Sequence, residues 1–138
     1  MIALAFALLA ATAAPAQTRA PAQGAKIVLV AFTGPEDMMR LRAPYHHAMI
    51  MKREGADVAI VVYARAVAGL SMRGKTPPMI RKEQKAALHA GIPVFACKAS
   101  MKRAGITIAD LLPGVTPVES GAGKIAALVA QGYVPMQY

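Results

Sequence analysis

The sequence contains a single cysteine, Cys97, in 138 residues. One cysteine excludes an internal disulfide, so this thiol stays free, pairs with another chain or reacts. Aromatic side chains are also scarce, with four Tyr and three Phe, which disfavours a nucleic-acid partner because single strands bind by stacking on such rings. Acidic residues are few: seven Asp and Glu oppose sixteen Lys and Arg, for a net charge of +9. That excess suits an anionic small molecule, an acidic partner or an anionic membrane surface.

Charge is absent from the first 16 residues, and residues 2–11 form an apolar block of the length found in secretory signals. An Ala-Pro-Ala sequence that ends at Ala16 is a cleavage site of the usual small-residue type. The block is too short to span a bilayer, which takes about 20 apolar residues. We therefore predict a signal peptide over 1–16, a flexible leader over 17–25 and one domain over 26–138. This organisation predicts a periplasmic or secreted protein without stable membrane insertion after cleavage, and a membrane-tethered N-terminus is the alternative.

Apolar runs alternate with helical patterns along the rest of the chain. Residues 26–32 and 57–63 are continuous and rich in β-branched side chains, which is typical of strands covered on both faces. Weaker strand patterns lie at 92–96, 115–118 and 133–138, and helical patterns lie at 36–54, 79–90, 98–103 and 121–131. The alternation predicts an α/β fold, a three-layer α/β/α sandwich around a mainly parallel sheet of about five strands. Within the first helical pattern, we expect the main helix to begin at Pro44 after a short turn, rather than to kink around it.

Cys97 directly follows a predicted buried strand and precedes a short basic helical segment. In parallel sheets the carboxyl ends of the strands are where active sites lie. The N–H groups of a helix start and the cations Lys98, Lys102 and Arg103 favour thiolate over thiol, so Cys97 is our candidate catalytic residue. Ser100 could hydrogen-bond the sulfur or cap the following helix, and we expect capping. The competing interpretation is that Cys97 is a buried small hydrophobe, as many free cysteines are.

Two further motifs resemble parts of a redox site and of a copper site, but both are incomplete. The Cys97-x-x-Ser100 sequence lacks the second thiol of a dithiol redox motif, which disfavours a thioredoxin-type reductase. His46 and His47, with Met49 and Met51 nearby, are copper-ligand types. Helical spacing points neighbouring side chains about 100° apart, so no complete ligand set shares a face. We predict no metal site.

Residues 120–124, Ser-Gly-Ala-Gly-Lys, resemble a phosphate-binding loop before a helix. The motif requires Gly where this chain has Val118 and Ser or Thr where it has Ile125. We therefore predict no nucleotide and no bound cofactor, and a tight strand-to-helix turn at these glycines. Weak anion binding at the helix start stays open.

The segment from Gly91 to Ile106, GIPVFACKASMKRAGI, resembles the strand, C-x-x-S and basic-Gly pattern of the DsrE/DsrF-like family. Residues 110–115, the closing helix with Gly132-Tyr133, and residues 55–70 fit as well, so the resemblance covers 26–138. It implies a flavodoxin- or Rossmann-like three-layer fold, homo-oligomers (trimers or hexamers), and a cysteine that carries sulfur as a persulfide. Only Cys97 is carried over as a functional residue. The chain departs from the family by inserting Ala104 between its basic residue and glycine.

Our main hypothesis is an exported DsrE-like protein that holds sulfane sulfur as a persulfide on Cys97, supported by Lys98, Ser100, Lys102 and Arg103. Its partners would be a sulfur donor or acceptor protein or a small anionic sulfur species. Export means that the cytoplasmic tRNA-thiolation partners of sulfur-relay proteins are not implied. If the protein is an enzyme, its chemistry is that of a sulfurtransferase. The alternative is a non-catalytic binding or assembly module with a structural cysteine, and a third option is copper or thiol-stress binding through Met and His.

Overall fold

The computed structural model describes residues 22–138. The predicted signal peptide and the leader up to residue 21 lie outside these residues. Five strands form one sheet in the order β4-β3-β2-β1-β5, and every pairing is parallel. The elements in chain order are β1 (Lys26–Ala31), α1 (Met38–Arg53), β2 (Asp57–Val62), η1 (Ala64–Leu70), α2 (Pro78–His89), β3 (Val94–Cys97), α3 (Lys98–Arg103), η2 (Ile108–Asp110), β4 (Thr116–Val118), α4 (Gly121–Ala130) and β5 (Val134–Gln137).

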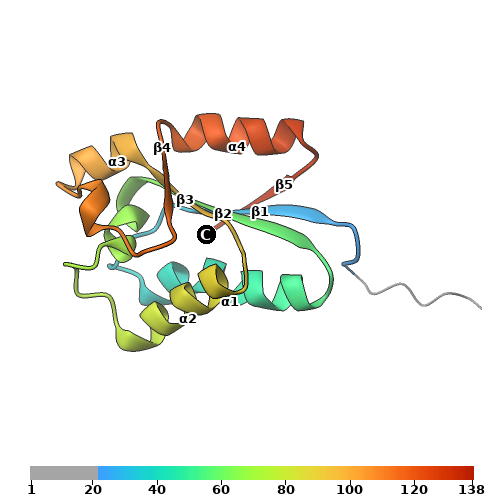
Figure 1. Ribbon diagram of the computed structural model, residues 1–138, viewed down its shortest axis with the longest axis horizontal. Coiled ribbons are helices and arrows are strands. Elements are labelled where there is room, and N and C mark those ends of the chain that lie inside the picture. The colour runs from blue at the N-terminus through green and yellow to red at the C-terminus, as the bar shows by residue number, and fades with distance from the viewer. Residues whose placement is uncertain (1–21) are drawn as a thin grey trace, which may run out of the picture.

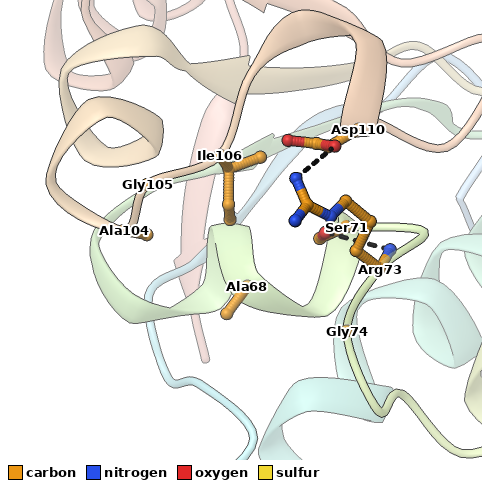
Figure 2. Close-up of a pocket in the computed structure, with 8 residues that line it drawn as sticks. All are labelled: Ala68, Ser71, Arg73, Gly74, Ala104, Gly105, Ile106 and Asp110. Atoms are coloured by element: carbon orange, nitrogen blue, oxygen red, sulfur yellow. Dashed lines mark hydrogen bonds and ion pairs between the residues drawn. The ribbon is translucent and has the colours of Figure 1, made fainter.

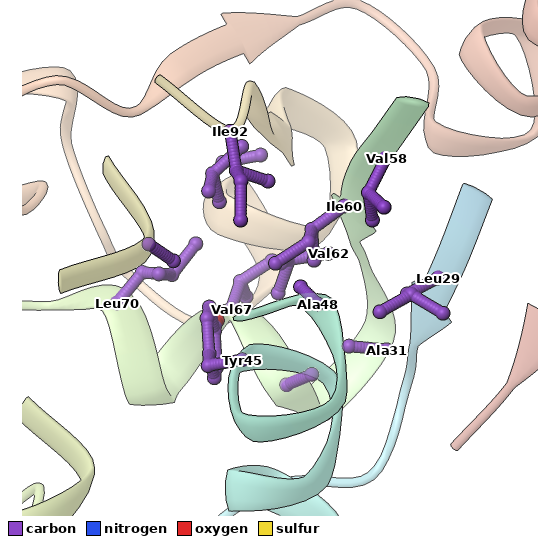
Figure 3. Packing of buried hydrophobic residues seen from close by; sticks show 14 of the residues in the cluster. Leu29, Ala31, Tyr45, Ala48, Val58, Ile60, Val62, Val67, Leu70 and Ile92 are labelled. Atoms are coloured by element: carbon purple, nitrogen blue, oxygen red, sulfur yellow. The ribbon is translucent and has the colours of Figure 1, made fainter. Parts of the chain in front are cut away.

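The sheet lies between two helical layers, with α1 and α2 below it and α4 above it in Figure 1. On the α1 side, Leu29, Ile60 and Val62 pack against Tyr45 and neighbouring residues, as Figure 3 shows. The opposite face of the sheet, which includes Val28, Val30 and Val61, packs against Leu128 of α4. The predicted three-layer α/β/α sandwich is therefore confirmed, and its sheet is parallel throughout.

Strands β1 and β2 form because their side chains are buried on both faces of the sheet. All but one of the residues of β2 are buried, and four of the six residues of β1 are. Complete burial of an aliphatic side chain such as Leu29 or Ile60 contributes about 1.5 to 3 kcal/mol. The two central strands thus anchor the core, and the shorter strands β3 and β4 extend the sheet to one side.

Helix α1 does not begin at Pro44. It begins at Met38, after Asp37 accepts a hydrogen bond from the Arg40 N–H as N-cap, and it continues through Pro44 to Arg53. The expectation of a separate start at Pro44 is therefore wrong. The buried face of Leu41 and Tyr45 runs past the proline, and this packing offsets the backbone hydrogen bond that Pro44 cannot donate.

The carboxyl edge of the sheet carries the site. β3 begins at Val94, two residues later than predicted, and ends at Cys97, which is also the N-cap residue of α3. The strand predicted at 133–138 is β5, which pairs with β1 at the far edge of the sheet, and all four of its residues are exposed. None of the helices within residues 22–138 has the length and apolar character needed to cross a bilayer.

Candidate functional site

Cys97 sits where three segments meet at the carboxyl edge of the sheet. It pairs in register with Val118 of β4, and the short turn after β4 brings the start of α4 back over it. The approach is close at Gly121, because a Cβ atom there would lie 3.3 Å from the Cys97 Cβ and 2.9 Å from the Tyr63 Cβ. Glycine is therefore the residue that lets α4 begin beside the thiol. Cys97 itself is only 5% exposed.

Hydrogen-bond donors surround the sulfur. Burial is the largest single influence on the Cys97 pKa and raises it. The Ser100 hydroxyl and the N–H groups of Ser100, Gly121 and Ala99 lower it, and together they outweigh burial, so the pKa lies below its ordinary value. These donors favour the negative charge of a thiolate over the neutral thiol.

Ser100 is oriented for this role by a strained residue. The Ser100 Oγ accepts a hydrogen bond of 2.8 Å from the N–H of Ala64, which leaves the hydroxyl hydrogen free to point at the sulfur. Ala64 has a φ of 51°, a left-handed conformation that is unusual without glycine. Such strain persists where surrounding contacts fix the backbone, and it clusters at functional sites.

The helix η1, which begins at Ala64, is held by hydrogen bonds from a cluster of polar side chains. The Gly69 carbonyl in η1 accepts hydrogen bonds from Thr76, Arg81 and the fully buried Gln84. Arg81 also donates to the Gln84 side chain and to the backbone of Ser71. These bonds fix η1, and thereby Ala64, relative to helix α2.

The four predicted supporting residues are distributed unevenly. Ser100 is among the groups that lower the Cys97 pKa, but the expectation that it caps α3 is wrong, because Cys97 is the N-cap residue and Ser100 is the third residue of the helix. Lys98 forms an ion pair with Glu119. Lys98 and Lys102 both border a cavity on the other side of α3 from Ser100, whereas Arg103 lines a cavity with Ser100 itself. The groups that lower the thiol pKa are neutral donors, and these cations are not among them.

Two cavities flank η1. The Ser100 cavity, about 300 Å³, is lined by Ala64, Arg65, Ser100, Arg103 and Ala104. A second cavity of about 340 Å³ is shown in Figure 2, where the Arg73 guanidinium reaches to 3.4 Å from the Asp110 carboxylate. Hydrogen bonds from the Thr107 N–H and hydroxyl lower the pKa of Asp110, so that carboxylate is ionised and neutralises Arg73. The Ser100 cavity shares Ala64 and Ser100 with the surroundings of the thiol.

The histidines take structural roles in this arrangement. The His46 Nδ1 lies 3.2 Å from an Arg42 nitrogen and 3.3 Å from the Glu83 carboxylate. The His47 Nδ1 lies 2.8 Å from the Tyr138 hydroxyl. Within the described part of the chain, no group of three or more His, Cys, Asp or Glu residues is placed to hold a metal ion.

Sequence reasoning did not identify Ala64 or Gly121 as site residues. Gly121 and its neighbours were predicted to form a tight strand-to-helix turn, which the structure confirms: Ser120 caps α4 by accepting from the Gly123 N–H. The signal that places Gly121 at the thiol is its position after β4, the strand that pairs with β3. No local pattern marks Ala64.

One protein-family model covers nearly all of the described residues. The model described as DsrE/DsrF-like family matches residues 25–138. The chain belongs to this family. Membership of the DsrE/DsrF-like family indicates a role related to sulfur relay, with partner proteins of that kind. No curated protein matches the chain significantly.

Solved structures agree with this DsrE/DsrF-like fold. The protein of unknown function MTH1491 from Methanobacterium thermoautotrophicum superimposes with a TM-score of 0.68 and 20% identity, over 82% of this chain and 99% of its own. The ychN protein from E. coli has a TM-score of 0.67 and 22% identity, over 83% and 99%. The protein BT1422 from Bacteroides thetaiotaomicron has a TM-score of 0.60 and 16% identity, over 82% and 94%. At these identities the likeness shows the fold alone.

Proposed function

We propose that this DsrE/DsrF-like protein is an exported sulfur carrier that holds sulfane sulfur as a persulfide on Cys97. The observation that carries the proposal is that the starts of two helices meet at Cys97, which is the N-cap residue of α3 and lies so close to α4 that a Cβ on Gly121 would come within 3.3 Å of its own Cβ. The Ser100 hydroxyl and the N–H groups of these helix starts lower the Cys97 pKa. These donors favour a negative sulfur atom, and the thiolate is the nucleophile in exchange at sulfur. Residues 1–16 support export, to the periplasm, because they carry no charge and contain an apolar signal-like block.

The loading step follows from ordinary thiolate chemistry. With an inorganic polysulfide as donor, the Cys97 thiolate attacks the terminal sulfur and forms a new S–S bond. The S–S bond behind that terminal atom breaks, and the shortened polysulfide leaves with the electron pair. The outer atom of the resulting persulfide lies about 2 Å beyond the buried thiol sulfur, which is closer to an acceptor at the surface.

Mass spectrometry of the intact protein tests the carrier role. After treatment with inorganic polysulfide, we expect an adduct with the mass of one sulfur atom, removable by a thiol reductant. The Cys97→Ala variant should show none, and it serves as the control because the chain contains one cysteine. Wild-type protein that gains no sulfur under these conditions would remove the proposal.

One observation favours a second function, that of a non-catalytic binding or assembly module. Cys97 is 5% exposed, as a structural cysteine would be. This function predicts a thiol that resists alkylation in the folded protein and a Cys97→Ala variant that keeps its binding partners. Alkylation of the folded protein therefore separates the two functions.

For the assembly of the carrier we propose a homo-oligomer, a trimer or hexamer, formed through α4 and β5. Val129 on α4 is 45% exposed, and Val134 and Met136 on β5 are 62% and 40% exposed. An uncovered edge strand with apolar side chains is a surface that proteins usually cover. Sedimentation should give an oligomer for the wild type and a smaller species for a Val134→Lys/Met136→Lys variant, and a monomeric wild type would contradict it.

A further inference from the structure

Two guanidinium groups line the Ser100 cavity, those of Arg65 and Arg103. Its wall also includes Ser100, whose hydroxyl lowers the Cys97 pKa. Arg103 forms no ion pair with any residue of the 22–138 segment, in contrast to Arg73 in the neighbouring cavity. The Arg103 charge at this cavity is therefore not neutralised by an ion pair within the described residues.

Arg65 forms a surface ion pair, and its side chain is 77% exposed. Its guanidinium lies 3.0 Å from the Glu36 carboxylate, and its backbone packs against Gly34, where an added Cβ would come within 2.9 Å of the Arg65 carbonyl oxygen. Of the two guanidiniums that line the cavity, that of Arg65 is thus paired with a carboxylate, and that of Arg103 has no such partner within residues 22–138. The unmatched donors suit an anion that presents several oxygens, because a guanidinium donates two parallel hydrogen bonds to such groups.

We propose, on the basis of the function proposed above, that the Ser100 cavity binds the sulfonate end of a sulfane-sulfur donor of the thiosulfate class. Such a donor joins a transferable sulfur to a trigonal group of three oxygens. Its oxygens bind Arg65 and Arg103, and its sulfane sulfur reaches Cys97 past the Ser100 side chain. The cavity volume of about 300 Å³ is at the small end of ligand sites and matches a small inorganic donor.

The transfer balances without a further reactant. The Cys97 thiolate attacks the sulfane sulfur, a new S–S bond forms, and the bond between the sulfane sulfur and the sulfonate sulfur breaks. Sulfite leaves with the electron pair, so three negative charges are present before and after. Arg65 and Arg103 stabilise the charge that develops on the departing sulfite, which is the role of cationic clamps in group transfer.

The test compares two donors on three proteins. Wild type, an Arg65→Gln/Arg103→Gln variant and a Lys52→Gln/Arg53→Gln variant are each treated with thiosulfate or with inorganic polysulfide. Lys52 and Arg53 are exposed in the last turn of α1, and this end of the helix lies at the opposite edge of the sheet from Cys97. The control variant therefore loses two positive charges, as the test variant does, but away from the site. The readouts are the persulfide mass on Cys97 and, for thiosulfate, released sulfite.

We expect the Arg65→Gln/Arg103→Gln variant to load from thiosulfate about tenfold more slowly than the control, since each lost charge-assisted bond is partly exposed to solvent. Loading from polysulfide should stay within about twofold of the control, which also shows that the variant is folded. Equal losses with both donors, or a wild type that loads from polysulfide but not from thiosulfate, would overturn the cavity assignment alone. A wild type that loads from neither donor would overturn the carrier function as well.

Discussion

Gly121 controls how closely α4 approaches the thiol, and its substitution by alanine gives a graded test of the site. The added methyl group would lie 2.9 Å from the Tyr63 Cβ and 3.3 Å from the Cys97 Cβ, so α4 or its neighbours must move. Overpacking of this kind costs about 1 to 3 kcal/mol of unfolding free energy. The same movement takes the Gly121 N–H away from the sulfur, which removes one donor from the thiolate.

Gly123→Ala is the matched control, two residues along the same helix. A Cβ there would meet only Ser120 atoms, at 3.5 and 3.6 Å, which is ordinary contact. Alanine also favours helix over glycine by up to about 1 kcal/mol. In urea denaturation we expect Gly121→Ala to be less stable than Gly123→Ala by at least about 1 kcal/mol, and to alkylate more slowly at neutral pH. Equal stability and equal alkylation would refute the close approach of α4 to Cys97.

Three further predictions concern the donors and the support beneath them. Ser100→Ala should slow alkylation of the folded protein about tenfold at neutral pH, because a hydrogen bond to a charged group contributes about 1.5 to 3 kcal/mol, whereas Ser71→Ala should leave the rate unchanged. Because the Cys97 pKa is lower folded than its ordinary value of 9.0, thiolate stabilisation is complete above that pH and is lost as the pH falls through the folded pKa. The difference in unfolding free energy between wild type and Cys97→Ala should therefore grow from neutral to alkaline pH, and a constant difference would contradict the lowered pKa. Gln84→Leu, which leaves the Arg81 guanidinium without its side-chain acceptor, should cost about 2 kcal/mol in urea denaturation, and a neutral effect would contradict a role for this cluster in fixing η1.

Sequence patterns predicted the layers of this fold because the central strands are buried on both faces. Strands β1 and β2 were predicted to within one residue, and α3 over its full length. The start of α1 was not, because our interpretation rested on Pro44 and did not consider Asp37, which caps the helix. The packing of Tyr45 against the sheet, which holds one helix through Pro44, is a tertiary effect.

The sequence predicted Cys97 and one of the groups that act on it, the Ser100 hydroxyl. The strand end placed Cys97 at the carboxyl edge of the sheet, which follows from the rule for parallel sheets. Gly121 and Ala64, whose N–H donates to Ser100, come from distant parts of the chain. The order of the strands in the sheet brings them to the thiol, and no local pattern shows this. The sequence favoured the adjacent cations instead, and Lys98 is directed to Glu119, a residue beyond β4 that no local pattern links to it.

The central claim is that Cys97 is a reachable thiolate in the folded protein. The pH dependence of its alkylation by iodoacetamide, measured on the wild-type protein without denaturant, tests this most directly. We predict a rate that reaches half of its plateau below the ordinary thiol pKa of 9.0. A half-point at or above that value, or a thiol that reacts only after unfolding, would contradict it.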